Sequence, residues 1–128
     1  MASPSFKLRS MFMAGIEDED EFDEFADTLD LRPIAGDITC PWMAIAGEDD
    51  QLSPVRHTEE LFDLIKAPKR LVVYEGANHG LNEGASVQLG ENRATLIADW
   101  LKDRLDDKPA ASERVFIDST GRATVTAV

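Results

Sequence analysis

Residues 41–50 read Pro-Trp-Met-Ala-Ile-Ala-Gly-Glu-Asp-Asp, an apolar run that ends in a glycine and three acidic residues. The apolar residues do not alternate with polar ones, which is typical of a short strand buried on both faces of a parallel sheet. We therefore predict a strand over residues 42–46 and a polar loop that contains Asp50. In an open α/β sheet, the loop that follows a strand lies at the edge where ligands bind.

A helix is predicted directly after this loop. Ser53 is a suitable N-cap residue, and Pro54 suits the first helical position. The helix should continue to about Lys66, with three apolar side chains facing the core. These are Leu61, Phe62 and Ile65.

A second strand and a second helix follow. Residues 71–74, Leu-Val-Val-Tyr, come after a break at Pro68 and favour a buried strand. Residues 92–105 place apolar side chains at helical spacing. Their apolar face is formed by Leu96, Ile97, Trp100, Leu101 and Leu105. The order strand, helix, strand, helix predicts an α/β fold: a βαβα unit of parallel strands with flanking helices.

The two ends of the chain are less clearly patterned. A short helix that ends at Gly15 and an amphipathic helix over 19–29 are predicted, which gives a helical segment 1–35 before the α/β segment 36–106. The acidic run 17–24 suits a solvated helix start better than a metal site, because consecutive carboxylates point around a helix. Residues 107–128 are compatible with a hairpin or with a frayed tail.

Composition excludes some classes of function. The formal net charge is -12, from 25 acidic residues against 13 lysines and arginines. Such a surface repels phosphate backbones and anionic lipids, so we expect neither a nucleic-acid nor a membrane partner. Cys40 is the one cysteine, and no apolar run has the length of a membrane helix or the form of a signal peptide. A cytoplasmic protein without cofactor or metal is expected.

Asp50 and His79 are the candidate catalytic residues. Each follows a predicted strand, and adjacent parallel strands would bring the two loops together. A carboxylate there can accept a hydrogen bond from the imidazole Nδ1–H and stabilise the cation that forms when histidine takes a proton. Asp49 competes for the acid position. His57 lies in the first turn of the predicted helix, where it is expected to be an ordinary helix residue.

This order of elements over residues 36–105 resembles the C-terminal part of an α/β-hydrolase. The resemblance is carried by Gly-x-x-Asp-x-x-x-Pro at 47–54 and Gly-x-x-His at 76–79. It implies that Asp50, which matches both the glycine and the proline spacing, is the acid of a catalytic triad, and that His79 is its base. It also implies an incomplete sheet, since these are the last two strands of that fold.

The segment 1–35 has a looser resemblance of its own. Leu-Asp-Leu at 29–31, ahead of Ile-Thr-Cys-Pro at 38–41, is similar to the return from a helical cap to the core in prolyl-oligopeptidase-like and FrsA-like esterases.

The sequence lacks the nucleophile that this family requires. No Gly-x-Ser-x-Gly is present; Ser86 follows Gly84 at the right offset, but Gln88 stands where glycine is expected, after the histidine. Cys40 lies at the far end of the first strand from Asp50. Two strands with two or three helices would also leave an open sheet edge and an apolar patch, which favour association.

These observations are compatible with three alternative functions. The first is a serine hydrolase of carboxylic esters or related acyl substrates, for which this chain supplies the acid and histidine and a complementing segment supplies the serine. The second is a non-catalytic remnant that acts through self-association or partner binding. The third, ranked last because no glycine-rich phosphate loop is visible, is a Mg²⁺ site formed by residues 48–50.

Overall fold

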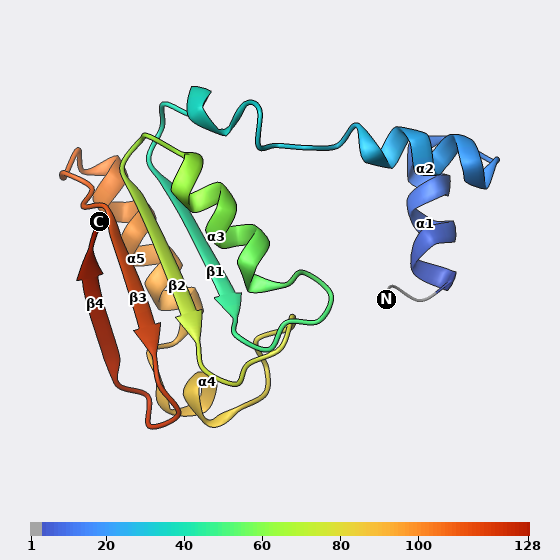
Figure 1. Ribbon diagram of the computed structural model, residues 1–128. Coiled ribbons are helices and arrows are strands. Elements are labelled where there is room, and N and C mark those ends of the chain that lie inside the picture. The colour runs from blue at the N-terminus through green and yellow to red at the C-terminus, as the bar shows by residue number, and fades with distance from the viewer. Residues whose placement is uncertain (1–3) are drawn as a thin grey trace.

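The computed structural model describes residues 4–128 and contains one four-stranded sheet with helices on both faces (Figure 1). Residues 1–3 of the expected N-terminal segment lie outside the described part. The elements are α1 (Pro4–Ala14), α2 (Glu19–Asp27), the 3-10 helix η1 (Ala35–Asp37), β1 (Trp42–Gly47), α3 (Val55–Leu64), β2 (Lys69–Tyr74), α4 (Ala85–Leu89), α5 (Arg93–Leu105), β3 (Glu113–Ile117) and β4 (Ala123–Ala127).

The predicted α/β class is confirmed, and β1 and β2 are parallel as expected. Their register runs from Trp42 opposite Lys69 to Gly47 opposite Tyr74, so both strands end at the same edge of the sheet. The loops after β1 and β2 therefore start side by side, which is the condition for a site between them.

The sheet is larger than the two strands predicted, because residues 113–127 form a hairpin that joins it. β3 pairs with β2 in parallel, and β4 pairs with β3 in antiparallel orientation. Asp118 holds the hairpin turn: its side chain accepts hydrogen bonds from the backbone N–H groups of Thr120 and Arg122. Of the two alternatives for residues 107–128, the structure has the hairpin, and its Ile117 is 1% exposed in the core.

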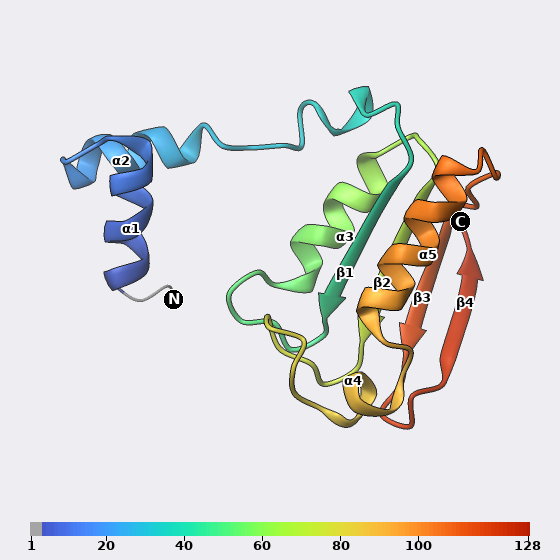
Figure 2. The ribbon, with the colours of Figure 1, turned by 180° about the vertical axis from the view of Figure 1, so that it is seen from behind.

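The core lies mainly between the sheet and α5, and α3 covers the opposite face (Figure 2). The prediction that β1 is buried on both faces was wrong: its first four residues are only half-buried, because β1 is an edge strand. The apolar face predicted for α5 is also covered only in part. Leu96 is buried, whereas Leu101 and Leu105 are 51% and 86% exposed.

The start of α3 differs from the prediction. Pro54, and not Ser53, takes the N-cap position, and its side chain makes no capping bond. The backbone N–H of Ser53 instead donates to the carboxylate of Asp50. The carboxylate therefore organises the loop between β1 and α3, and the helix begins one residue later than expected. Phe62 and Ile65 are buried as predicted, and Leu61 is half-buried.

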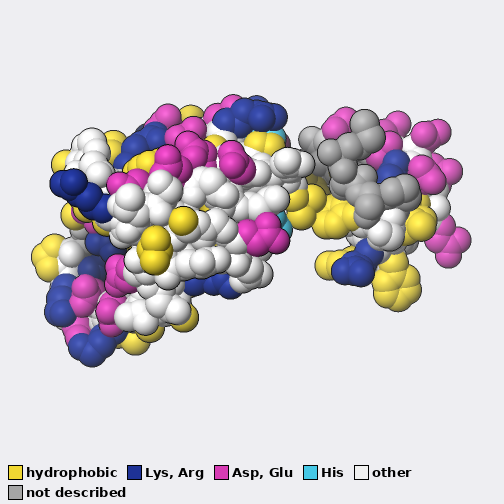
Figure 3. Space-filling model, turned by 90° about the horizontal axis from the view of Figure 1, so that it is seen from below, with side chains coloured by type: hydrophobic (Ala, Val, Ile, Leu, Met, Phe, Trp, Pro, Cys, Tyr) yellow, Lys and Arg dark blue, Asp and Glu magenta, His cyan; other side chains and the backbone are white. Residues whose placement is uncertain are grey.

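The two N-terminal helices stand apart from the sheet at the end of an extended connection (Figures 1 and 2). Lys7 of α1 forms ion pairs with Glu19 and Asp23 of α2, and Asp18 caps α2. Hydrophobic side chains lie on their surface beside acidic ones (Figure 3), and Phe12 is 86% exposed. No helix in residues 4–128 is long and apolar enough to cross a membrane.

Candidate functional site

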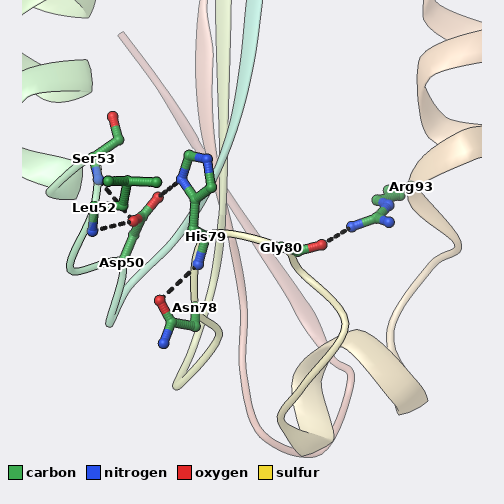
Figure 4. A network of polar contacts seen from close by, with 7 residues as sticks. All are labelled: Asp50, Leu52, Ser53, Asn78, His79, Gly80 and Arg93. Atoms are coloured by element: carbon green, nitrogen blue, oxygen red, sulfur yellow. Dashed lines mark hydrogen bonds and ion pairs between the residues drawn. The ribbon is translucent and has the colours of Figure 1, made fainter. Parts of the chain in front are cut away.

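Asp50 and His79 meet at the edge of the sheet where β1 and β2 end (Figure 4). Nδ1 of His79 lies 2.8 Å from Oδ2 of Asp50, although 29 residues separate the two in sequence. The side chain of Asp50 is 7% exposed, and that of His79 is 55% exposed. The structure thus brings together the two residues that the sequence singled out, with a buried carboxylate beneath an accessible imidazole.

The surroundings of Asp50 favour its ionised form. Burial raises the pKa of this carboxyl, but hydrogen bonds from Ser53 N–H, the His79 ring and Leu52 N–H together hold the pKa below its usual value of 3.8. The two backbone groups donate to Oδ1 at 2.8 and 2.9 Å, which leaves Oδ2 for the histidine. An ionised carboxylate only accepts hydrogen bonds, so Nδ1 of His79 donates to it, and in the neutral imidazole this leaves Nε2 as the acceptor.

Gly47 allows the two loops to approach each other. A Cβ atom at this position would lie 2.3 Å from the carbonyl oxygen of Ala77 and 2.8 Å from that of Asn78. A hydrogen bond also joins the backbones of the two loops at this point, since Asp49 N–H donates to the Ala77 carbonyl at 3.0 Å. Any side chain larger than hydrogen at position 47 would therefore push away the loop that carries His79.

The loop that carries His79 is held at several points. Asn78 Oδ1 accepts the backbone N–H of His79 at 2.8 Å, and Glu48 accepts the N–H of Gly76 at 3.1 Å. Beyond the histidine, the guanidinium of Arg93 donates to the carbonyls of Gly80 and Leu81. These contacts fix both sides of a loop whose histidine is largely exposed.

Asp49 and His57, the competing candidates, take no part in this contact. The side chain of Asp49 is exposed, and His57 lies on α3 next to residues 29–32 and Glu60. Ser86 is buried in α4 and donates to the Glu75 carbonyl, which accounts for it as a structural residue. Cys40 is exposed at the opposite end of β1 from Asp50.

The acidic loop 48–50 does not form a metal cage. Its three carboxylates have different surroundings, because Glu48 accepts from Gly76, Asp50 accepts from the His79 ring and Asp49 is exposed. Within residues 4–128, no group of three or more histidine, cysteine, aspartate or glutamate side chains could hold a metal ion. A surface hollow of about 690 Å³ lies beside the pair and is lined in part by these carboxylates.

Sequence reasoning missed Arg93, Asn78 and the role of Gly47. Gly47 had a visible signal, because it ends the apolar run directly before the acidic loop. Arg93 had no such signal in the sequence, since its contact with residues 80–82 depends on how the first turn of α5 is placed relative to the loop.

Comparison with known proteins gave no significant match. No protein-family model matches the chain, and neither a curated protein nor a solved structure matches it significantly.

Proposed function

We propose that this chain supplies the acid and the base of a serine hydrolase that acts on carboxylic esters or related acyl compounds. The observation that carries the proposal is the contact between Asp50 and His79 at the carboxyl edge of two parallel strands. The C-terminal part of an α/β-hydrolase, which the sequence resembles over residues 36–105, uses an acid and a histidine in this order.

In this role His79 is the general base. Asp50 holds the tautomer in which Nε2 is unprotonated, so Nε2 can take the proton from a serine hydroxyl as the oxygen attacks the acyl carbon. The imidazolium that forms lies 2.8 Å from the Asp50 carboxylate, which stabilises it. His79 then returns the proton to the leaving alcohol, and the cycle repeats with water to release the acid.

The nucleophile in this proposal comes from a segment outside residues 4–128. The hydrogen bonds of His79 go to Asp50 and to Asn78, and Ser86 is committed to the Glu75 carbonyl. Ser53 lies three residues after Asp50, and its backbone N–H donates a hydrogen bond to the Asp50 carboxylate. A complementing segment or chain has to bring a serine to the exposed face of His79.

The open edge of β1 is where such a segment would add. The N–H groups of Trp42 and Glu48 point to β2, so by alternation those of Met43 and Ile45 point away from it. This edge has no proline, charge or bulge within the strand, although exposed edges usually carry such features. A parallel strand paired there would end next to Asp50, whereas the other free edge, on β4, lies two strands beyond β2.

The experiment that tests the proposal is to sequence the DNA that flanks the coding region in the source genome. We expect a Gly-x-Ser-x-Gly in the same reading frame upstream or in an adjacent gene. The joined or co-expressed protein should hydrolyse p-nitrophenyl acetate, and His79→Ala should abolish that activity. Stop codons close upstream, with no such motif in a neighbouring gene, would contradict the proposal.

A second candidate function, association without catalysis, is favoured by the same open edge. Ile45→Pro removes an outward N–H from β1 while leaving its hydrogen bonds to β2 in place. Val125→Pro is the matched control, since the register places the Val125 N–H on the open edge of β4. If association uses β1, sedimentation should show that Ile45→Pro alone weakens it. Equal effects would exclude the β1 edge as the interface.

A further inference from the structure

The position of His79 depends on its backbone more than on its side chain. The imidazole is 55% exposed, and its side-chain hydrogen bond goes to Asp50. A half-exposed ring with so few contacts stays in place only if the loop that carries it is held. The first half of that loop is joined to the β1 side by the hydrogen bond from Asp49 N–H to the Ala77 carbonyl.

Arg93 holds the second half. Its Nη1 donates to the carbonyl oxygens of Gly80 at 2.6 Å and Leu81 at 2.9 Å, and Nη2 donates to Asn82 Oδ1 at 3.0 Å. Three consecutive residues directly after the histidine are therefore bound by one guanidinium (Figure 4 shows its contact with Gly80). The planar, multi-donor fork suits this arrangement, which a lysine ammonium could not reproduce in full.

The backbone on either side of Arg93 is also held in place. Arg93 is the first residue of α5, and Asn92 caps that helix by accepting from the N–H groups of Ala94 and Thr95. The preceding carbonyl, of Glu91, accepts a hydrogen bond from the buried Tyr74 hydroxyl at 2.8 Å. The backbone that carries Arg93 is thus anchored to Tyr74 at the end of β2 and to the cap of α5, and the half-buried side chain of Arg93 joins it to the loop.

The backbone of the loop also needs such support. Leu81 has a φ of +49°, in the left-handed region that non-glycine residues rarely adopt. Residues in such conformations persist when their surroundings hold them. Both backbone polar groups of Leu81 are used, its N–H by the Asn78 carbonyl and its carbonyl by Arg93.

We propose that Arg93 is a positioning residue: by binding the backbone carbonyls of Gly80 and Leu81 and the side chain of Asn82, it holds the His79 ring at hydrogen-bonding distance from Asp50. The inference rests on the proposed function of His79 as a base, because that function needs the Nδ1–H tautomer. Arg93 acts through the loop and not on a substrate. Its removal should therefore release the imidazole while leaving the sheet in place.

The test uses the ¹⁵N signals of the imidazole rings in the full chain at alkaline pH, where imidazole is neutral. The chain has two histidines, so His57 is an internal reference in the same spectrum. In the natural chain, His79 should show a protonated Nδ1 and an unprotonated Nε2. In Arg93→Ala, its two nitrogen signals should move toward each other as the tautomers mix, while those of His57 stay unchanged.

Two further variants separate positioning from general destabilisation. Lys102→Ala removes a cation from the other end of α5, where its partner is Asp106, and should leave the His79 signals unchanged. Arg93→Lys keeps the charge but loses the fork, and should give an intermediate tautomer mixture. It also provides the readout if Arg93→Ala does not fold.

His79 signals that coincide with those of the natural chain in folded Arg93→Lys and Arg93→Ala would overturn the positioning role. That outcome would leave the proposed hydrolase function intact. Mixed His79 tautomers in Arg93→Ala, together with a genome that encodes no complementing serine, would support the positioning role of Arg93 and contradict the hydrolase proposal.

Discussion

Gly47 of β1 lies opposite Tyr74 of β2, and this register brings the loops after both strands to the same point. Three residues after Gly47 comes Asp50, and five residues after Tyr74 comes His79. Their side chains meet at 2.8 Å because the strands are parallel and end together. The candidate site is therefore a direct consequence of the pairing of two short strands.

Replacement of Gly47 by alanine should damage this junction. The new Cβ would lie 2.3 Å from the Ala77 carbonyl oxygen, so the His79 loop has to move. We expect the free energy of unfolding to fall by about 1–3 kcal/mol in urea denaturation, as for other over-packed sites.

Gly36→Ala is the matched control, because the nearest atom to its Cβ would be 3.8 Å away. Its stability should change by less than about 1 kcal/mol. Equal losses of unfolding free energy in the two variants would show that the Ala77 carbonyl does not lie as close to Gly47 as 2.3 Å from a Cβ implies.

The β3–β4 hairpin should contribute to the core and not behave as a tail. Ile117 is 1% exposed, so Ile117→Ala should destabilise the protein by about 2–5 kcal/mol. Val125 on β4 is 58% exposed, and Val125→Ala should stay within about 0.5 kcal/mol of the natural chain. Thermal unfolding of both variants checks this prediction, and a harmless Ile117→Ala would mean that the hairpin does not dock.

Acid should weaken the fold in part through Asp50, whose pKa is held below its usual value by hydrogen bonds from Ser53, His79 and Leu52 against the opposing effect of burial. A group with a lowered folded pKa stabilises the fold above its unfolded pKa, and that contribution is lost as pH falls through the folded value. Below about pH 4, the natural chain should thus lose stability more steeply than Asp50→Asn.

The control for this measurement is Asp49→Asn, which removes the exposed neighbouring carboxylate. Its stability at neutral pH should stay within about 0.5 kcal/mol of that of the natural chain, as for an ordinary surface substitution. If the Asp50→Asn curve of unfolding free energy against pH ran parallel to that of the natural chain, the hydrogen bonds to Asp50 would not favour its ionised form.

Much of this arrangement could be predicted from local sequence. The apolar runs gave both parallel strands, and the residues after them gave Asp50 and His79. The predictions that were wrong concern features that distant residues determine. The burial of β1 is one of them: the strand is half-exposed because, among the described residues, no strand pairs with its outer edge. Ser53 does not cap α3 as predicted, because the Asp50 carboxylate binds the N–H groups of Leu52 and Ser53 in the preceding turn and the helix begins only at Val55. Arg93 could not be found, because its acceptors are backbone carbonyls 12 and 13 residues away, which leave no pattern in the sequence.

The central claim, that Asp50 activates His79 as a base, is tested most directly by initial rates of p-nitrophenyl acetate hydrolysis by this chain. Without a serine the rates should be low, because positioned general bases give large gains only with a positioned nucleophile. His79→Ala should nevertheless lower the rate by more than His57→Ala, and Asp50→Asn should lower it to the level of His79→Ala. Equal rates for His79→Ala and His57→Ala, with Asp50→Asn unchanged from the natural chain, would contradict the claim.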